Sequence, residues 1–516
     1  MRIKLYDTTL RDGSQSSDVN FGIRDKLEIV KALDEFGIHY IELGWPGSNK
    51  KDMETFLEAS KLKLKKAKIV AFGSTRRKGL KAEQDPNLQA VLKSKAKAAC
   101  IFGKTWLDHI KKQLKADPKE NLKAIGDSVK FLKKNNLEVF YDAEHFFDGF
   151  KDNKKYALET LKVAASSGAS VLVLCDTNGG TLPSELSSVI KEVDDFFDGK
   201  VSLGLHSHND SGVAVANSIA AAELGVTQIH GTINGLGERA GNADLCQIMA
   251  ILEIKKDMRL GVKLEKLTKL SRLVYTLANI KPTNHEPFVG KNAFSHKGGI
   301  HVDAVMKGAS YEHIDPALVG NKRDIVLSDL SGKANIVEVL KKFGVKAKKN
   351  DPKVKAMLEK VEFLEKKGYD IGALNAEQFL LVKEFFGRKK EHFRIDTWKI
   401  LSEKRNGEYS ECVLTGLVDG KNREVVAPIQ GGPVGAVYHA LQKMIATNYK
   451  EIRSVKLINY KVMIAEDKAA DSSVRVYIEF KNGKEEFGTV GVSTNILEAS
   501  LEAIEKGFRY YMLKNC

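Results

Sequence analysis

A repeated alternation of strand-like and helix-like segments over the first 260 residues constrains the fold more than any other feature of this chain. Short apolar or β-branched runs alternate with longer amphipathic segments, which is the pattern of repeated βα units. The expected strands are residues 3–7, 40–45, 68–73, 98–103, 137–143, 170–176, 201–208 and 228–234. Eight such units in roughly 250 residues predict a closed parallel (β/α)8 TIM barrel, because each strand is covered by its following helix and no edge stays open. An open doubly wound sheet is the alternative on pattern alone.

Length and composition predict further folded units and a cytoplasmic location. The 516 residues exceed a typical domain of ~150 residues several-fold. A hydrophobic content of 43% with 29% charged residues excludes a mainly disordered chain. No apolar run approaches the ~18 residues that cross a bilayer, and no hydrophobic secretion segment opens the sequence, so no membrane contact is expected. The five scattered cysteines never form a CxxC spacing and are expected to be free thiols.

The net charge of +15 raises the possibility of a nucleic-acid partner, because a basic surface attracts polyphosphate. The distribution of charge argues against it. Lysines dominate over arginines, and the lysine-rich stretch 341–367 has acidic residues mixed into it. A solvated, heat-adapted surface is the favoured interpretation, and no nucleic-acid partner is expected.

Polar residues gather where the expected strands end, which is where the chemistry of a barrel collects. His206 and His208 are two residues apart on a strand, so both imidazoles project to the same face. Asp12 and Asn242 would reach the same mouth from expected strands one and eight. Two nitrogens with oxygen donors suit Mg²⁺, Mn²⁺ or Zn²⁺ with open positions for a substrate. Because no thiol joins the set, a closed structural zinc site is not expected.

Three more side chains at this mouth suit a reaction on a carboxylate substrate. Arg11 offers a planar cation for a carboxylate or a developing enolate oxygen; a buried ion pair is its alternative role. Glu144 ends strand five, where a carboxyl can act as an acid–base group; supporting Arg11 or a ligand histidine is its alternative. Thr177 can offer its hydroxyl to a bound carboxylate or cap a helix.

Four motifs, in order along the chain, carry a family resemblance. They are DTTLRDG (7–13), LHSHND (205–210), GLGERAGNADL (235–245) and HKGGIHVDAV (296–305). Together they closely resemble the acyl-CoA condensing enzymes of the DRE-type metal-dependent TIM-barrel superfamily, the group of 2-isopropylmalate, homocitrate and citramalate synthases. GWPGSNKKD (44–52) and AFGSTRR (71–77) resemble the citramalate synthase branch.

The resemblance implies a role for each matching residue. The matches to metal ligands are Asp12, His206 and His208, with Asn242 as a weaker fourth donor. Arg11 matches the residue that polarises the 2-oxo carbonyl, and Thr177 matches a contact to the substrate carboxylate. Glu144 matches the acid–base carboxylate near the acetyl methyl group. His301 and Tyr311 match residues that complete the active site of the partner subunit.

The implied activity is a Claisen-type condensation of acetyl-CoA with pyruvate, followed by thioester hydrolysis, which gives (R)-citramalate and CoA. This is the first step of a threonine-independent route to isoleucine. The resemblance also implies a divalent metal ion, a homodimer and isoleucine as feedback effector. One rival is a 2-isopropylmalate synthase acting on 2-oxoisovalerate, and pocket size decides between the two. Another is a retro-aldol lyase, against which the long C-terminal extension argues.

The expected domains are a barrel over residues 1–285, helical linker subdomains over 286–390 and a C-terminal α+β regulatory domain over 391–516. The last part carries an internal repeat of three strands and a helix. The first copy is expected near 394–401, 411–417, 423–428 and 433–445, and the second near 454–464, 473–480, 485–491 and 495–510. Two βββα units predict helices on one side of antiparallel sheets. The region resembles a regulatory domain that binds an amino acid, with a plain dimerisation domain as the alternative. The pair Gly431 and Gly432 would let backbone amides approach a ligand carboxylate.

Overall fold

The computed structural model of the chain describes residues 3–296, 311–325, 327, 331–372, 374–387, 391–404, 407–464, 472–483 and 485–516. The chain divides into two compact units. The first is Met1–Phe294 with Ile314–Lys322, and the second is Ser295–His313 with Arg323–Cys516.

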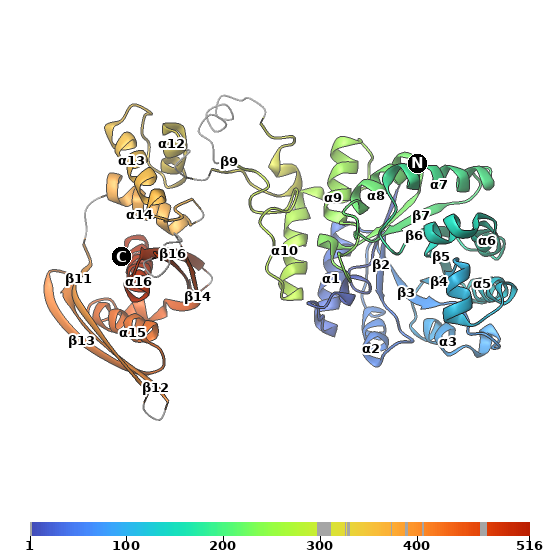
Figure 1. Cartoon of the computed structure of the whole chain (residues 1–516), viewed down its shortest axis with the longest axis horizontal. Helices are drawn as coiled ribbons and strands as arrows, with labels where there is room; N and C mark the ends of the chain where they lie inside the picture. Colours follow the sequence, from blue (N-terminus) through green and yellow to red (C-terminus); the bar gives the residue numbers. More distant parts are fainter. Residues whose placement is uncertain are drawn as a thin grey trace. The chain divides into compact units, whose positions relative to one another are not determined.

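Eight parallel strands close into a barrel in the first unit (Figure 1). They are β1 (Lys4–Asp7), β2 (Tyr40–Gly44), β3 (Lys68–Ser74), β4 (Ala98–Lys104), β5 (Glu138–Glu144), β6 (Val171–Asp176), β7 (Leu203–Ser207) and β8 (Gln228–Gly231). The last strand pairs with the first, with Tyr6 opposite His230, so the ring is complete. The prediction of a (β/α)8 barrel is therefore confirmed over the open doubly wound sheet.

Helices cover the outside of this barrel. They are α1 (Ile23–Phe36), α2 (Lys50–Ala59), α3 (Pro86–Lys93), α4 (Leu107–His109), α5 (Pro118–Lys134), α6 (Phe146–Ser166), α7 (Pro183–Phe196), α8 (Ala214–Glu223), α9 (Leu245–Ala250) and α10 (Leu267–Ala278). In α1 the apolar residues Val30, Leu33 and Phe36 recur on one buried face, as their spacing predicts. Gly37 then ends the helix with φ of +111°, a conformation that glycine adopts without the steric penalty of a side chain.

Side chains of the strands pack on both sides of the barrel wall, one set against the helices and one set inside the barrel. Because successive residues of a strand face opposite sides, Leu5 packs toward the surrounding helices while its neighbour Tyr6 belongs to a separate cluster. That inner cluster consists of Tyr6, Tyr40, Val70, Phe72, Ala98, Cys100 and Phe140. The barrel is thus a packed core, which leaves the polar residues beyond the strand ends as the place for chemistry.

Several strand ends differ from the sequence prediction, and those of β7 and β8 bear on the mouth of the barrel. Strand β8 stops at Gly231 rather than residue 234, because Asn234 takes a left-handed conformation with φ of +65° within a 3₁₀ turn. Asparagine tolerates that conformation better than most residues. Strand β7 stops at Ser207, and His208 instead forms an isolated bridge with Asn242. That bridge joins two of the expected metal ligands.

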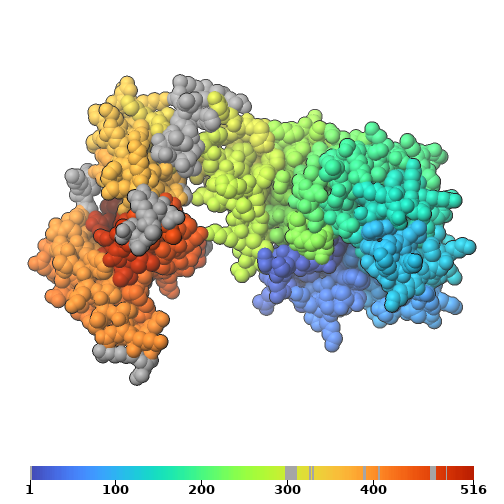
Figure 2. Space-filling model, in the orientation of Figure 1, coloured from blue at the N-terminus to red at the C-terminus, as the bar shows by residue number. Residues whose placement is uncertain are grey.

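The second unit combines a helical segment with two three-stranded antiparallel sheets. Its helical segment contains α12 (Lys333–Lys342), α13 (Pro352–Lys366) and α14 (Asn375–Phe386), and it also holds the short pair β9 (Ser295–His296) and β10 (Asp324–Ile325). The first sheet and its helix are β11 (Phe393–Lys404), β12 (Glu408–Val418), β13 (Lys421–Gln430) and α15 (Pro433–Ile445). The second set is β14 (Lys456–Ile464), β15 (Val474–Asn482), β16 (Glu485–Ser493) and α16 (Ile496–Asn515). The predicted repeat of two βββα units is confirmed, and in Figure 2 the orange and red atoms of the two copies are packed together.

Two further sequence-based expectations concern membranes and thiols. Within the described part of the chain, no helix is both long and apolar enough to span a bilayer. Each of the five cysteines is a free thiol, and all but Cys516 are buried. The prediction of unpaired cysteines is therefore confirmed.

Candidate active site

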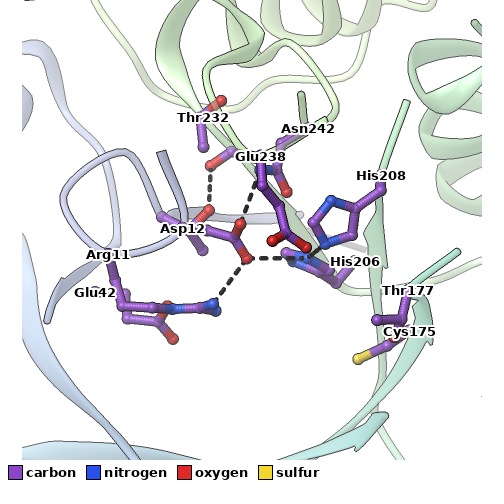
Figure 3. A network of polar contacts seen from close by, with 12 residues as sticks. Arg11, Asp12, Glu42, Cys175, Thr177, His206, His208, Thr232, Glu238 and Asn242 are labelled. Carbon is purple, nitrogen blue, oxygen red and sulfur yellow. Dashed lines mark hydrogen bonds and ion pairs between the residues drawn. The ribbon is translucent and has the colours of Figure 1, made fainter. Parts of the chain in front are cut away.

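Asp12, His206 and His208 converge at the mouth of the barrel (Figure 3). One potential ligand atom of each lies within 4.8 Å of the others. His206 Nε2 is 3.4 Å from His208 Nε2 and 3.5 Å from Asp12 Oδ2. The three side chains come from the ends of β1 and β7, which both flank β8 in the closed ring. The sequence expectation that these residues meet is therefore correct in its geometry.

The electrostatics of this cluster suit a cation. Burial lowers the pKa of His206 to about 3 and lowers the pKa of His208 as well, so both imidazoles are neutral at physiological pH. Burial alone would raise the pKa of Asp12, but Arg11 and the two histidines hold it well below its ordinary value. Neutral imidazole and ionised carboxylate are the forms that bind a metal ion.

Asn242 adds an oxygen to the same place. Its Nδ2 donates to Asp12 Oδ1 and to the Leu236 carbonyl, each at 3.1 Å. Its Oδ1 is buried and meets no hydrogen-bond donor among the described residues. A buried acceptor without a partner is costly unless something else satisfies it. Two nitrogens and two oxygens arranged in this way fit a divalent cation with open positions.

Arg11 is held beside this cluster by three contacts. Its Nε meets Glu42 Oε1 at 2.5 Å, its Nη1 meets Asp12 Oδ2 at 2.8 Å, and its guanidinium carbon lies 3.8 Å from the centre of the Phe72 ring. The buried ion pair considered as its alternative role is therefore present. No described residue accepts a hydrogen bond from its Nη2, so that donor can reach a bound ligand.

Glu42 is a part of the site that sequence analysis missed. This fully buried carboxyl on β2 accepts the Tyr6 hydroxyl at 2.5 Å as well as Arg11. Burial raises the pKa of Glu42, which Arg11 and Tyr6 oppose. The available signal was an acidic residue inside the otherwise apolar run YIELGW. Glu238, to which no role was assigned either, reaches toward the histidines from the loop after β8 (Figure 3).

The remaining expected site residues lie in different surroundings. Thr177 follows β6 and is drawn beyond His206 in Figure 3; its hydroxyl accepts the backbone N–H of His145 at 2.9 Å. Glu144 ends β5 and pairs with Lys104 at 2.5 Å. Tyr311 is 50% exposed and belongs to the second unit. His301 lies outside the described residues. The expected roles of these four residues stay predictions.

Asp142, two residues before Glu144 on β5, is expected to make the stability of the barrel depend on pH. Burial, followed by the nearby charge of Glu42, raises its pKa from 3.8 to about 7. The folded chain then keeps a proton that the unfolded chain releases, so this carboxyl lowers the free energy of unfolding as pH rises from about 4 through about 7. We expect the melting temperature of Asp142→Asn, relative to wild type, to rise by several degrees between about pH 5 and pH 8. Thermal melts of both proteins at both pH values measure this. A difference in melting temperature that is the same at pH 5 and pH 8 would contradict it.

Three known domain families match successive parts of the chain. They are HMGL-like over residues 2–274, homocitrate synthase post-HMGL domain-like over 288–368, and the LeuA allosteric (dimerisation) domain over 374–512. Among full-length relatives, an (R)-citramalate synthase of Aquifex aeolicus (strain VF5) is 45% identical, and the alignment covers 100% of this chain and 98% of the relative. An (R)-citramalate synthase of Geobacter sulfurreducens is also 45% identical, with 99% and 98% covered. A 2-isopropylmalate synthase of Oceanobacillus iheyensis is 30% identical, with 99% and 98% covered.

The barrel, its polar mouth and the order of these domains define the class as acyl-CoA condensing enzymes, which are acyltransferases. Within that class, the relatives of higher identity share one name over nearly the whole length of this chain. The chain belongs to the (R)-citramalate synthase family.

Proposed function

We propose that this enzyme joins acetyl-CoA to pyruvate and hydrolyses the product thioester, releasing (R)-citramalate and CoA. The observation that carries the proposal is the convergence of Asp12, His206 and His208 within 4.8 Å in a chain that is 45% identical over its full length to an (R)-citramalate synthase. We assign the reaction to the first step of a threonine-independent route to isoleucine, in the cytoplasm.

We assign the cation site to Asp12, His206 and His208, with Asn242 Oδ1 as the fourth donor. Mg²⁺, Mn²⁺ and Zn²⁺ all suit this donor set. When bound, the ion supplies a Lewis acid for the ketone and carboxylate oxygens of a 2-oxo acid. The neutral imidazoles and the ionised Asp12 support this assignment, as does the buried Asn242 oxygen without a partner.

The other residues of the mouth act on the two substrates. Arg11, fixed by Glu42, directs its Nη2 to the oxygen of the pyruvate carbonyl, where negative charge develops when the carbonyl carbon is attacked. Thr177 donates its hydroxyl to the pyruvate carboxylate. Glu144 takes a proton from the acetyl methyl group, and the pair of electrons left behind forms the new carbon–carbon bond. Water then breaks the thioester, and His301 and Tyr311 complete the site in the partner subunit.

The substrate is tested by release of free thiol from acetyl-CoA in parallel with pyruvate, 2-oxoisovalerate and 2-oxoglutarate. We expect pyruvate to give a kcat/KM at least about 10-fold above 2-oxoisovalerate, since a pocket that fits a methyl group discriminates by ~1–3 kcal/mol against larger chains. A preference for 2-oxoisovalerate would instead establish the 2-isopropylmalate synthase activity seen at 30% identity. Thiol release without any 2-oxo acid is the background to subtract.

We also propose the domain limits 1–285, 286–390 and 391–516, a homodimer, and isoleucine as effector. The match to the HMGL-like family ends at residue 274, which supports the first limit. The match to the LeuA allosteric (dimerisation) domain covers residues 374–512, which supports a separate C-terminal domain, and Ala376 of α14 packs on the core of that domain from the linker side. The description of that family as allosteric and dimerising supports a dimer with an effector site, and the choice of isoleucine rests on the resemblance of the sequence to the condensing enzymes.

Gly432 offers a test of the effector site. It precedes α15, and a methyl group built on it would meet no atom of the protein within 4 Å. We expect Gly432→Val to keep basal turnover and to raise the half-inhibiting isoleucine concentration at least ~10-fold, because the side chain would occupy space at the amides that receive the effector carboxylate. Inhibition curves for both proteins measure this. Unchanged inhibition would place the effector elsewhere.

A further inference from the structure

The ammonium group of Lys104 faces the carboxylate of Glu144 at the mouth of the barrel. Lys104 ends β4 and Glu144 ends β5, and the two residues are direct partners in the parallel ladder. Their Nζ and Oε2 atoms are 2.5 Å apart, and the side chains are only 12% and 24% exposed. Among the described residues, Glu144 is the one carboxylate paired with this ammonium, and the contact is an ion pair that leaves Glu144 Oε2 without a hydrogen bond, so the ammonium protons can serve another ligand.

The backbone holds both residues firmly in place. The Lys104 carbonyl accepts a hydrogen bond from Asn121 Nδ2 at 2.8 Å. The Glu144 carbonyl accepts one from the Thr105 hydroxyl at 2.6 Å. The Lys104 ammonium also lies 5.7 Å from the centre of the Phe102 ring, which favours a cation over its face. The pair is therefore a preorganised arrangement of an anion and a cation.

A different pair on the same strand shows what a plain surface ion pair looks like here. Glu138, at the opposite end of β5, meets Lys68 at 2.8 Å and also accepts the Tyr40 hydroxyl. The Lys68 side chain is 53% exposed, and such pairs contribute little to stability. The Lys104 side chain is far more enclosed than that of Lys68, so water screens its charge less and it acts more strongly on a charge beside it.

The residues assigned so far do not stabilise the negative charge that develops on the thioester oxygen of acetyl-CoA. Removal of a proton from the acetyl methyl group places negative charge on the thioester oxygen, and Arg11 and the cation site are directed at the other substrate. The methyl carbon and the thioester oxygen are attached to the same carbonyl carbon, so a base at the methyl group stands close to that oxygen. A cation adjacent to the base is therefore within reach of the developing charge.

We propose that Lys104 is a further catalytic residue, which donates a hydrogen bond from its ammonium to the thioester oxygen of acetyl-CoA. Glu144 accepts the methyl proton; the C–H electron pair forms the carbon–carbon double bond of the enolate, and the carbonyl π pair moves to the oxygen that faces Lys104. When the enolate carbon attacks the ketone carbon of pyruvate, the thioester carbonyl reforms. This inference rests on the proposed function and on Glu144 as the base.

The test compares Lys104→Met, Lys104→Gln and Lys104→Arg with Lys68→Met as the matched control. Thiol release gives kcat and KM, and methyl-deuterated acetyl-CoA gives the isotope effect on kcat. We expect Lys104→Met to lower kcat ~10²–10³-fold, the loss seen when one oxyanion donor is removed, with the KM for pyruvate within about threefold. The slowed step is then proton removal, so a deuterium isotope effect appears. We expect the kcat of Lys104→Arg to be at least tenfold above that of Lys104→Met, and the kcat of Lys68→Met to stay within twofold of wild type.

Several results would overturn the inference. They are a Lys104→Met or Lys104→Gln enzyme within threefold of wild-type kcat, a loss of kcat without a deuterium isotope effect, or a Lys104→Arg enzyme as slow as Lys104→Met. Circular dichroism identifies a variant that fails to fold, and the remaining neutral variant then decides; if both neutral variants unfold, Lys104 is structural and the inference fails. A wild-type enzyme without thiol release on pyruvate contradicts the proposed function itself, whereas an active wild type with normal neutral variants contradicts only the role of Lys104.

Discussion

His206→Ala is expected to lower thiol release from acetyl-CoA and pyruvate at least ~10³-fold while the barrel stays folded. The substitution removes an imidazole that lies 3.4 Å from His208 Nε2 and 3.5 Å from Asp12 Oδ2. Loss of Lewis-acid assistance costs several kcal/mol in the barrier, and each 1.36 kcal/mol is tenfold in rate. The fold should survive because His206 sits beyond the packed aromatic layer of the barrel, at the end of β7. Asp12→Ala should behave in the same way.

The measurement includes metal content as well as turnover. Wild type treated with a chelator should lose activity and regain it with Mg²⁺, Mn²⁺ or Zn²⁺, whereas His206→Ala should bind less metal and regain little. His439→Ala, an exposed histidine on α15, is the matched control and should change neither quantity. If His206→Ala turns over at near wild-type rate in chelator-treated buffer, the assignment of the metal site is wrong.

The fold could be read from the sequence because local pattern and global architecture agree in the barrel. Each buried strand is an apolar run followed by an amphipathic helix, and stops such as Gly37 fall where the chain turns. The errors fall where a single residue overrides the pattern. Asn234 lies within an apolar stretch that favours a strand, yet its left-handed conformation ends β8 early. Such a conformational choice depends on the turn that follows and has no periodicity of its own.

The sequence predicts the candidate metal ligands of the site but not the buried charged residues beside them. The two-residue spacing of His206 and His208 predicts that both side chains face the mouth of the barrel. The barrel topology then brings Asp12 next to them. Glu42 and Lys104 give no signal of this kind, because each pairs with a residue about 30 to 40 positions away whose place depends on the register between strands. Pairing across a barrel is a tertiary property, so an acidic residue in an apolar strand reveals that it needs a partner without revealing which one.

Glu42→Gln is expected to lower the free energy of unfolding of the barrel by ~3–5 kcal/mol, the cost of removing one partner from a buried ion pair. Glu42 is fully buried and its two oxygens accept from Arg11 and from Tyr6. The amide still accepts one of these hydrogen bonds, but Arg11 loses one of the two carboxylates that offset its desolvation and keeps only Asp12. We also expect kcat to fall ~10–100-fold, because Arg11 no longer holds a fixed direction toward the substrate.

Urea titration of the barrel transition measures the stability, and thiol release measures kcat. Glu138→Gln is the matched control, since Glu138 pairs with the half-exposed Lys68 at the end of the barrel where the strands begin, and its loss should cost less than ~1 kcal/mol. The double variant Arg11→Met/Glu42→Gln removes both charges of this pair but leaves the buried Asp12 without its contact to Arg11, so it should recover only a small part of the stability lost in Glu42→Gln and no activity. A Glu42→Gln enzyme as stable and as fast as wild type would show that Arg11 is held by Asp12 alone.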